Sequence, residues 1–220
     1  MSTFMGRPTP KIFCIGMNKT GTTSVESAFR NMGLRLGRQR DGERLLEDWR
    51  AGRFDRILDL ARTADAFRDV PFSLPGTYEV LDAEFPDAKF VLTVRSSAER
   101  WFESIDRFTR KRLGVDRTVT AEDLRDDPYV FKGWSWRFWE SVFEADPRNP
   151  LDAERLMTVY RRHNEAVLRH FQDRPDRLLV LDVGGADAAG RLSSHVGRSL
   201  GRGGLPRLNA STGPERRHAA

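Results

Sequence analysis

The chain alternates between short apolar runs and longer segments in which apolar residues recur at helical spacing. Those longer segments carry apolar residues at i, i+3, i+4 and i+7, which is the period of a helix with one buried face. Strands that alternate with helices in this way favour an α/β fold with a mostly parallel sheet covered by helices. The runs of strand length are Lys11 to Gly16, Ala66 to Val70, Lys89 to Val94 and Arg177 to Asp182.

The helices are expected in the segments between these strands. The first follows the glycine-containing turn after the first strand and stops at Gly33, with Val25, Ala28, Phe29 and Met32 on its buried face. The others are predicted as one or two short helices within residues 41–63, and as single helices at about residues 78–85, 98–111, 131–143 and 151–172.

Residues 1–200 are predicted to form a single domain, and residues 201–220 a mobile tail. A chain of 220 residues is long enough to bury about 70% of its unfolded surface around one core. The tail is predicted because Gly, Pro, Arg and Ser dominate it. The charge-rich segment 113–127 is predicted to be a loop.

Composition narrows the classes of partner. The formal net charge is +5 and the pI about 9.8, but the basic residues are scattered among 32 acidic ones, which is typical of a solvated surface and does not predict nucleic-acid binding. The single cysteine, Cys14, excludes an internal disulfide. No apolar run approaches the ~18 residues of a membrane span. Residues 1–10 are too polar for a secretory signal, so we expect a cytoplasmic protein.

The turn after the first strand carries the clearest chemical signal. Gly16-Met17-Asn18-Lys19-Thr20-Gly21-Thr22-Thr23-Ser24 joins a strand to a helix through glycines, and the backbone N–H groups of a helix N-terminus attract anions. The nucleoside-triphosphatase signature needs a lysine directly after the second glycine. Thr22 stands at that position, and Lys19 in the middle of the loop is its only lysine.

The run Lys19-Thr20-Gly21-Thr22-Thr23-Ser24 resembles the 5′-phosphosulfate loop of sulfotransferases. The likeness is closest to small bacterial sulfotransferase-like proteins, and it continues through Phe85-Pro86-x-x-Lys89-Phe90 and Trp101-Phe102-Glu103-Ser104. It implies a three-layer P-loop-type sheet with a helical cap on the acceptor side. It also implies that the donor 3′-phosphoadenosine-5′-phosphosulfate (PAPS) is bound by Asn18, Lys19, Thr20, Gly21, Thr22, Thr23 and Ser24.

A second set of candidates comes from the strand ends, because ligands of parallel sheets bind at the carboxyl ends of strands. Asp69, Arg95 and Asp182 occupy those positions together with the loop of Lys19. A magnesium-dependent NTPase would be expected to place an acid after a central strand. Arg95 follows the strongest strand instead, and a guanidinium suits a second phosphate, unless it only forms a surface ion pair.

In the resembled family, that arginine and a serine of the next helix hold the 3′-phosphate of the donor, usually eight positions apart. The eighth position here is Glu103, and a serine follows it. On a helical wheel the buried face is defined by Trp101, Ile105 and Phe108. Ser104 lies on that face, whereas Glu103 points to solvent. We therefore assign this role to Arg95 and Ser104, with Ser96 or Ser97 as alternatives if the spacing is strict.

The general base is less clearly marked. Asp69 falls where the cytosolic sulfotransferases carry a histidine, and a carboxylate is chemically suitable because related families use a glutamate. The alternative is that Asp69 only caps a turn or pairs with an arginine. His163 lies on the same helical stripe as Tyr160 and Val167, which indicates a core histidine.

Two elements of the animal enzymes are missing. Ser24 stands where they carry a tryptophan that stacks on adenine, and only Arg202-Gly203-Gly204 and Arg207 resemble the segment that closes over the 3′-phosphate. The aromatic residues between positions 129 and 143 either line an acceptor pocket or form a core beneath a helical cap.

The function expected is a metal-independent, PAPS-dependent sulfotransferase that acts on a hydroxyl of a small molecule or carbohydrate, with Lys19 and Asp69 as catalytic residues. Two alternatives stay open. One is a P-loop kinase or NTPase with an unusual loop, and the other is a nucleotide-binding protein without catalytic activity.

Overall fold

The fold is built on four parallel strands in the order β2-β1-β3-β4, so the predicted parallel sheet is confirmed. The computed structural model describes residues 10–201 and 204–205. The rest of the predicted tail lies outside these residues. The strands are β1 (Ile12–Cys14), β2 (Ala66–Arg68), β3 (Lys89–Thr93) and β4 (Leu178–Leu181).

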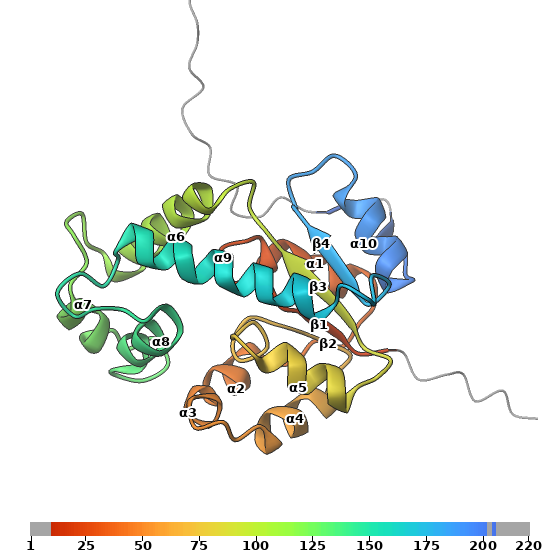
Figure 1. Cartoon of the computed structure of the whole chain (residues 1–220), viewed down its shortest axis with the longest axis horizontal. Coiled ribbons are helices and arrows are strands. Elements are labelled where there is room, and N and C mark those ends of the chain that lie inside the picture. Colours follow the sequence, from red (N-terminus) through yellow and green to blue (C-terminus); the bar gives the residue numbers. More distant parts are fainter. Residues whose placement is uncertain (1–9, 202–203, 206–220) are drawn as a thin grey trace, which may run out of the picture.

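Helices cover both faces of the sheet (Figure 1). Side chains of β1 alternate between the faces because successive residues of a strand point in opposite directions. Ile12 and Cys14 pack with α1 (Thr22–Asn31) and α10 (Ala188–Val196), whereas Phe13 packs with α4 (Asp55–Arg62), α5 (Thr77–Glu84) and the end of α9 (Ala153–His170). The described residues therefore form three layers.

A third hydrophobic cluster lies beyond the sheet, in the predicted helical cap. It joins α6 (Ala98–Leu113), α7 (Ala121–Asp126), α8 (Trp134–Phe143) and the first half of α9. In Figure 1, α7 and α8 lie at the far end of α6 and α9 from the strands. Helix α9 contributes Leu156 and Tyr160 to the cap and Val167 to the core beneath the sheet, so one helix connects the two cores.

Two segments differ from the sequence-based expectation. Residues 41–63 form three helices rather than one or two, namely α2 (Gln39–Glu43), α3 (Leu46–Arg50) and α4. The segment 113–127, predicted as a loop, contains α7. This helix forms because Thr120 and Asp123 make a capping box and Leu124 is buried, which outweighs the high local charge.

Within the described residues, no helix is both long enough and apolar enough to span a bilayer.

Gly16 allows β1 and β3 to approach closely. A Cβ at this position would lie 2.2 Å from Thr93 Oγ1 and 2.4 Å from the Thr93 carbonyl oxygen. We expect Gly16→Ala to lower the free energy of unfolding by about 1–3 kcal/mol through overpacking. Urea denaturation measures this.

Gly190, in helix α10, is the matched control. A Cβ there meets no atom within 4 Å, so Gly190→Ala should stabilise the protein by about 0.5–1 kcal/mol. Equal midpoints for the wild type and Gly16→Ala would contradict the close approach at Thr93.

Candidate active site

The loop between β1 and α1 is held by buried polar contacts. Lys19 and Gly21 have φ values of 72° and 104°, in the left-handed region, and the loop turns directly into α1. Thr20 is fully buried, and its hydroxyl donates to Met17 O at 2.6 Å. The Thr20 proton is thereby used, so Thr93, whose Oγ1 lies 2.5 Å away, donates to Thr20.

The cap and β3 hold the same loop from the other side. Trp101 Nε1 donates to Asn18 O at 2.9 Å, and Arg95 Nε donates to Lys19 O at 2.7 Å. The Trp101 indole stacks on Tyr160 with ring centroids 4.6 Å apart, and the Tyr160 hydroxyl accepts from Arg95 N at 3.0 Å. The loop is therefore fixed at two successive carbonyl groups.

A cavity of about 810 Å³ opens in front of this loop. It lies within the range of ~300–1,000 Å³ that is usual for small-molecule sites. Of the predicted residues, those that line it are Asn18, Lys19, Gly21, Thr22, Thr23, Asp69, Arg95 and Ser104. Among the described residues, three other candidates do not line the cavity, namely Thr20, Ser24 and Asp182.

The positions of Thr20 and Ser24 do not favour their predicted side-chain contacts with a donor, which stay predictions. Both side chains are buried, and Thr20 serves the loop itself. Among the other candidates, Asp182 accepts from Gly184 N in its own turn. Ser97 caps α6 by accepting from Arg100 N, so its side chain has a structural role.

Lys19 and Arg95 bring two positive charges to one wall of the cavity. Burial lowers the pKa of Lys19 below its usual value, and the charge of Arg95 lowers it further. Lys19 Nζ lies 3.8 Å from the centre of the Phe108 ring. Among the described residues, neither Lys19 nor the terminal nitrogens of Arg95 have a carboxylate partner.

Ser104, in helix α6, also lines the cavity. It is half-buried, whereas Glu103 is exposed and pairs with Arg100 at 3.3 Å. The helical wheel therefore predicted correctly that Ser104 is more buried than Glu103.

Asp69 follows β2 directly and lines the cavity. Its two carboxylate oxygens differ in their hydrogen bonds. Oδ2 accepts from Arg68, which also donates to Glu26 of α1 through Nε at 2.6 Å. Oδ1 is buried and has no hydrogen-bond partner among the described residues. The residue is 6% exposed, and its φ of 53° places it in the left-handed region. A buried, unpaired carboxylate oxygen at a cavity wall is costly unless a ligand supplies its partner.

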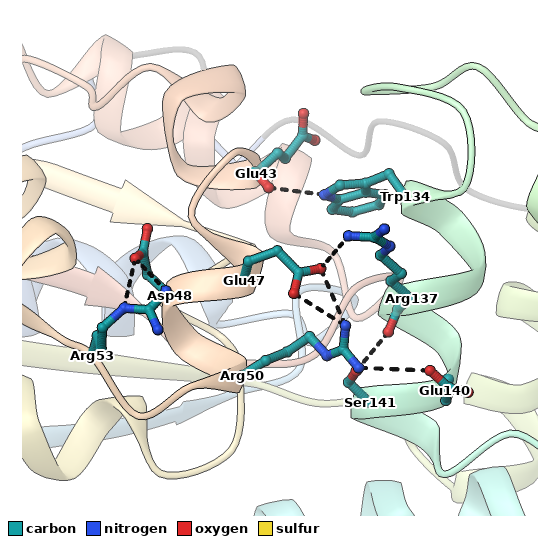
Figure 2. A network of polar contacts seen from close by, with 9 residues as sticks. All are labelled: Glu43, Glu47, Asp48, Arg50, Arg53, Trp134, Arg137, Glu140 and Ser141. Carbon is teal, nitrogen blue, oxygen red and sulfur yellow. Dashed lines mark hydrogen bonds and ion pairs between the residues drawn. The ribbon is translucent and has the colours of Figure 1, made fainter.

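Helices α2 and α3 contact helix α8 of the cap at another part of the cavity wall. Trp134 Nε1 donates to Glu43 O at 2.9 Å, and nearby Arg137 pairs with Glu47 at 3.1 Å (Figure 2). The Glu43 carboxylate is buried, and its Oε1 accepts from the Tyr129 hydroxyl at 2.6 Å. Burial and this hydrogen bond raise the pKa of Tyr129 to about 12.

The comparison with known families agrees with this geometry. The family model described as a sulfotransferase domain matches residues 11–213, which is most of the chain. The chain belongs to the sulfotransferase domain family. We find no significant match among curated proteins.

Several residues that line or support the cavity of this sulfotransferase domain were not predicted from the sequence. Glu43 and Phe108 line the cavity. Tyr129 lines it too, but it belongs to the aromatic segment for which a pocket was one of the two expectations. The aromatic pair of Trp101 and Tyr160 supports the loop and the strand end. Phe108 was expected on the buried face of its helix, but it is 44% exposed, and its ring contacts the Lys19 ammonium.

His163 lies in the core, as expected. It is 3% exposed, and its Nε2 donates to Ile15 O at 2.9 Å. Burial lowers its pKa. In the described part of the chain, no group of three or more His, Cys, Asp or Glu side chains is placed to hold a metal ion.

The contact between Lys19 and Phe108 gives a direct prediction. The face of an aromatic ring attracts an ammonium group by about 0.5–1 kcal/mol at an exposed site, so the ring favours the charged form. Phe108→Leu should therefore lower the pKa of Lys19 further. The pH dependence of Lys19 acylation, followed by mass spectrometry, measures this pKa.

Two variants control for loss of apolar volume. Phe108→Tyr keeps an aromatic face and should leave the pKa of Lys19 unchanged, as should Phe131→Leu, which alters an equally exposed ring elsewhere. A Phe108→Leu protein whose Lys19 titrates as in the wild type would show that the ring does not act on the ammonium.

Proposed function

We propose that this sulfotransferase domain moves a sulfuryl group from PAPS to a hydroxyl of a small-molecule or carbohydrate acceptor. The observation that carries the proposal is the convergence of Lys19, Arg95 and Asp69 on one cavity. Oδ1 of Asp69 has no hydrogen-bond partner among the described residues. Two cations suit a donor with two separate phosphate groups, and a carboxylate suits the acceptor proton.

The loop and α1 would hold the 5′ end of the donor. The N–H groups of the first turn of a helix have no partner within that helix, and Thr22 and Thr23 begin α1 at the cavity wall. Lys19 lies within the same loop and would stabilise the negative charge that grows on the leaving phosphate.

Arg95 and Ser104 would bind the 3′-phosphate. The Arg95 Nε is committed to Lys19 O, which leaves its two terminal nitrogens to donate to phosphate oxygens. The same hydrogen bond fixes the guanidinium relative to the loop, so the two phosphate sites keep a constant separation.

Asp69 would accept the proton of the acceptor. The acceptor oxygen forms a bond to sulfur as the bond between sulfur and the bridging phosphate oxygen breaks, and adenosine 3′,5′-bisphosphate leaves. The proton of the acceptor hydroxyl passes to Asp69 Oδ1. Glu43 also faces the cavity, but its Oε1 is occupied by Tyr129 and its Oε2 lies 3.1 Å from Arg40, which favours Asp69.

The loop position occupied by Thr22 argues against a nucleoside-triphosphatase, because the lysine of that signature is replaced there by a hydroxyl side chain. Lys19 lies three positions earlier.

Lys19→Ala tests the proposed role of the lysine. Loss of one group that stabilises transition-state charge costs ~10²–10³-fold in rate, so transfer of a labelled sulfuryl group to a mixed set of phenols and sugars should fall by at least that factor. The fold should be unchanged by circular dichroism. Lys132→Ala, which removes an exposed lysine paired with Asp126, should retain the wild-type rate.

Asp69→Asn tests the proton acceptor. The amide keeps the size of the side chain but cannot take a proton, and a general base contributes ~10²–10⁴-fold in rate. Binding of adenosine 3′,5′-bisphosphate should stay unchanged, with Asp59→Asn on the surface of α4 as the control. A wild-type protein that binds the bisphosphate but transfers no label would be a nucleotide-binding protein, and the proposed function would then be wrong.

A further inference from the structure

Helix α6 extends the cavity wall well beyond the predicted 3′-phosphate site. Arg107, Phe108 and Lys111 follow Ser104 along the lining face of this helix. Because an α-helix rises 1.5 Å per residue, Lys111 lies about 10 Å farther along the axis than Ser104. Phe108 still contacts Lys19, so it is the end of this wall at Lys111 that lies beyond the residues that we assign to the donor. We call the stretch from Arg107 to Lys111 the outer part of the cavity wall.

The outer part carries positive charge that the protein itself does not neutralise. Arg107 and Lys111 are exposed at the cavity wall and have neither an ion pair nor a side-chain hydrogen bond with any described residue. The acids that line the cavity are already engaged: Asp69 pairs with Arg68, and Glu43 with Arg40.

A third cation in the same region is occupied. Arg112 pairs with Asp127, and its Nη2 donates to Ser135 at 3.4 Å. It therefore supports the wall, whereas Arg107 and Lys111 are available to a ligand.

Aromatic side chains form the wall that faces α6. Trp134, Phe138 and Trp139 are buried in the core of the cap and also line the cavity, so the core expectation is confirmed. Trp134 stacks on Phe138 with centroids 5.3 Å apart. Tyr129 is 41% exposed. Such a wall suits a flat, apolar body.

We propose that the acceptor is a hydroxylated ring compound that carries an anionic group, a carboxylate or a phosphate, at the end distant from the reacting hydroxyl. This inference rests on the proposed function, because it places the hydroxyl at Asp69 Oδ1. The ring lies against the aromatic wall of α8, and Arg107 and Lys111 bind the anion. Because Arg107 and Lys111 are exposed, their charge also speeds the encounter between enzyme and an anionic acceptor.

The test uses matched probes, because the natural acceptor is unidentified. The probes are 4-hydroxyphenylacetate, 4-hydroxybenzylphosphonate and the neutral methyl ester of the first, each also with one further methylene. Their dissociation constants are measured by calorimetry on the full chain saturated with adenosine 3′,5′-bisphosphate, so that the donor site is filled.

The expected result is that an anionic probe binds about tenfold or more tightly than the ester. An exposed ion pair contributes up to about 1 kcal/mol, which is about fivefold in affinity, so Arg107→Gln and Lys111→Gln should each weaken the anionic probe by about that factor. Neither change should affect the ester or the bisphosphate. Arg100→Gln, on the same helix but paired with Glu103, should alter no affinity. The carboxylate and phosphonate arms identify which anion is preferred.

Equal affinity for the acids and their esters, or no binding of any probe, would overturn the proposal. So would a loss of bisphosphate affinity in Arg107→Gln or Lys111→Gln, because these cations would then belong to the donor site. Failure of the wild type to bind the bisphosphate is a separate outcome, which would overturn the proposed function and this inference with it.

Discussion

The hydrogen bond from Arg95 Nε to the carbonyl of Lys19 joins the two strand ends on which the site depends. It is possible because β1 and β3 are neighbours in the sheet and because Gly16 lets the first loop residue lie against Thr93. The contact places two cations at one cavity wall, although their mutual repulsion lowers the pKa of Lys19. An anionic ligand would relieve that repulsion, which is a physical reason for a site of this kind to bind phosphate groups.

The cap stabilises the same arrangement from outside the sheet. Trp101 reaches from α6 to the carbonyl of Asn18, and Tyr160 reaches from α9 to the backbone of Arg95. The two rings stack on each other within the core of the cap. The proposed donor side and the proposed acceptor side are therefore connected, because one aromatic pair belongs to the cap and supports the loop between β1 and α1.

Much of the fold and half of the site could be predicted from local patterns. The strands were evident because each is a short apolar run, and Lys19 and Arg95 were brought together by the rule that ligands bind at the carboxyl ends of parallel strands. Ser104 was separated from Glu103 by helical periodicity alone. These signals are local, or follow from one simple rule of sheet topology.

The remaining features depend on contacts between distant segments. The sequence gives no sign that the Thr20 hydroxyl turns inward, because its partner Thr93 is 73 positions away. It also gives no sign that Arg68 occupies only one oxygen of Asp69, or that Phe108 lies beneath the Lys19 ammonium. Helix α7 differs from the expectation for a local reason, because high charge indicates a loop, whereas the capping box of Thr120 and Asp123 starts a helix.

Thermal unfolding with adenosine 3′,5′-bisphosphate, compared with ATP, tests most directly whether this cavity is a phosphosulfate-donor site. A ligand at 100 times its dissociation constant adds about 2.7 kcal/mol of stability, which corresponds to a rise in melting temperature of about 5–11 °C for a domain of this size. The account predicts that the bisphosphate produces this shift equally in magnesium and in EDTA. Stabilisation by ATP with magnesium alone, and none by the bisphosphate, would contradict it.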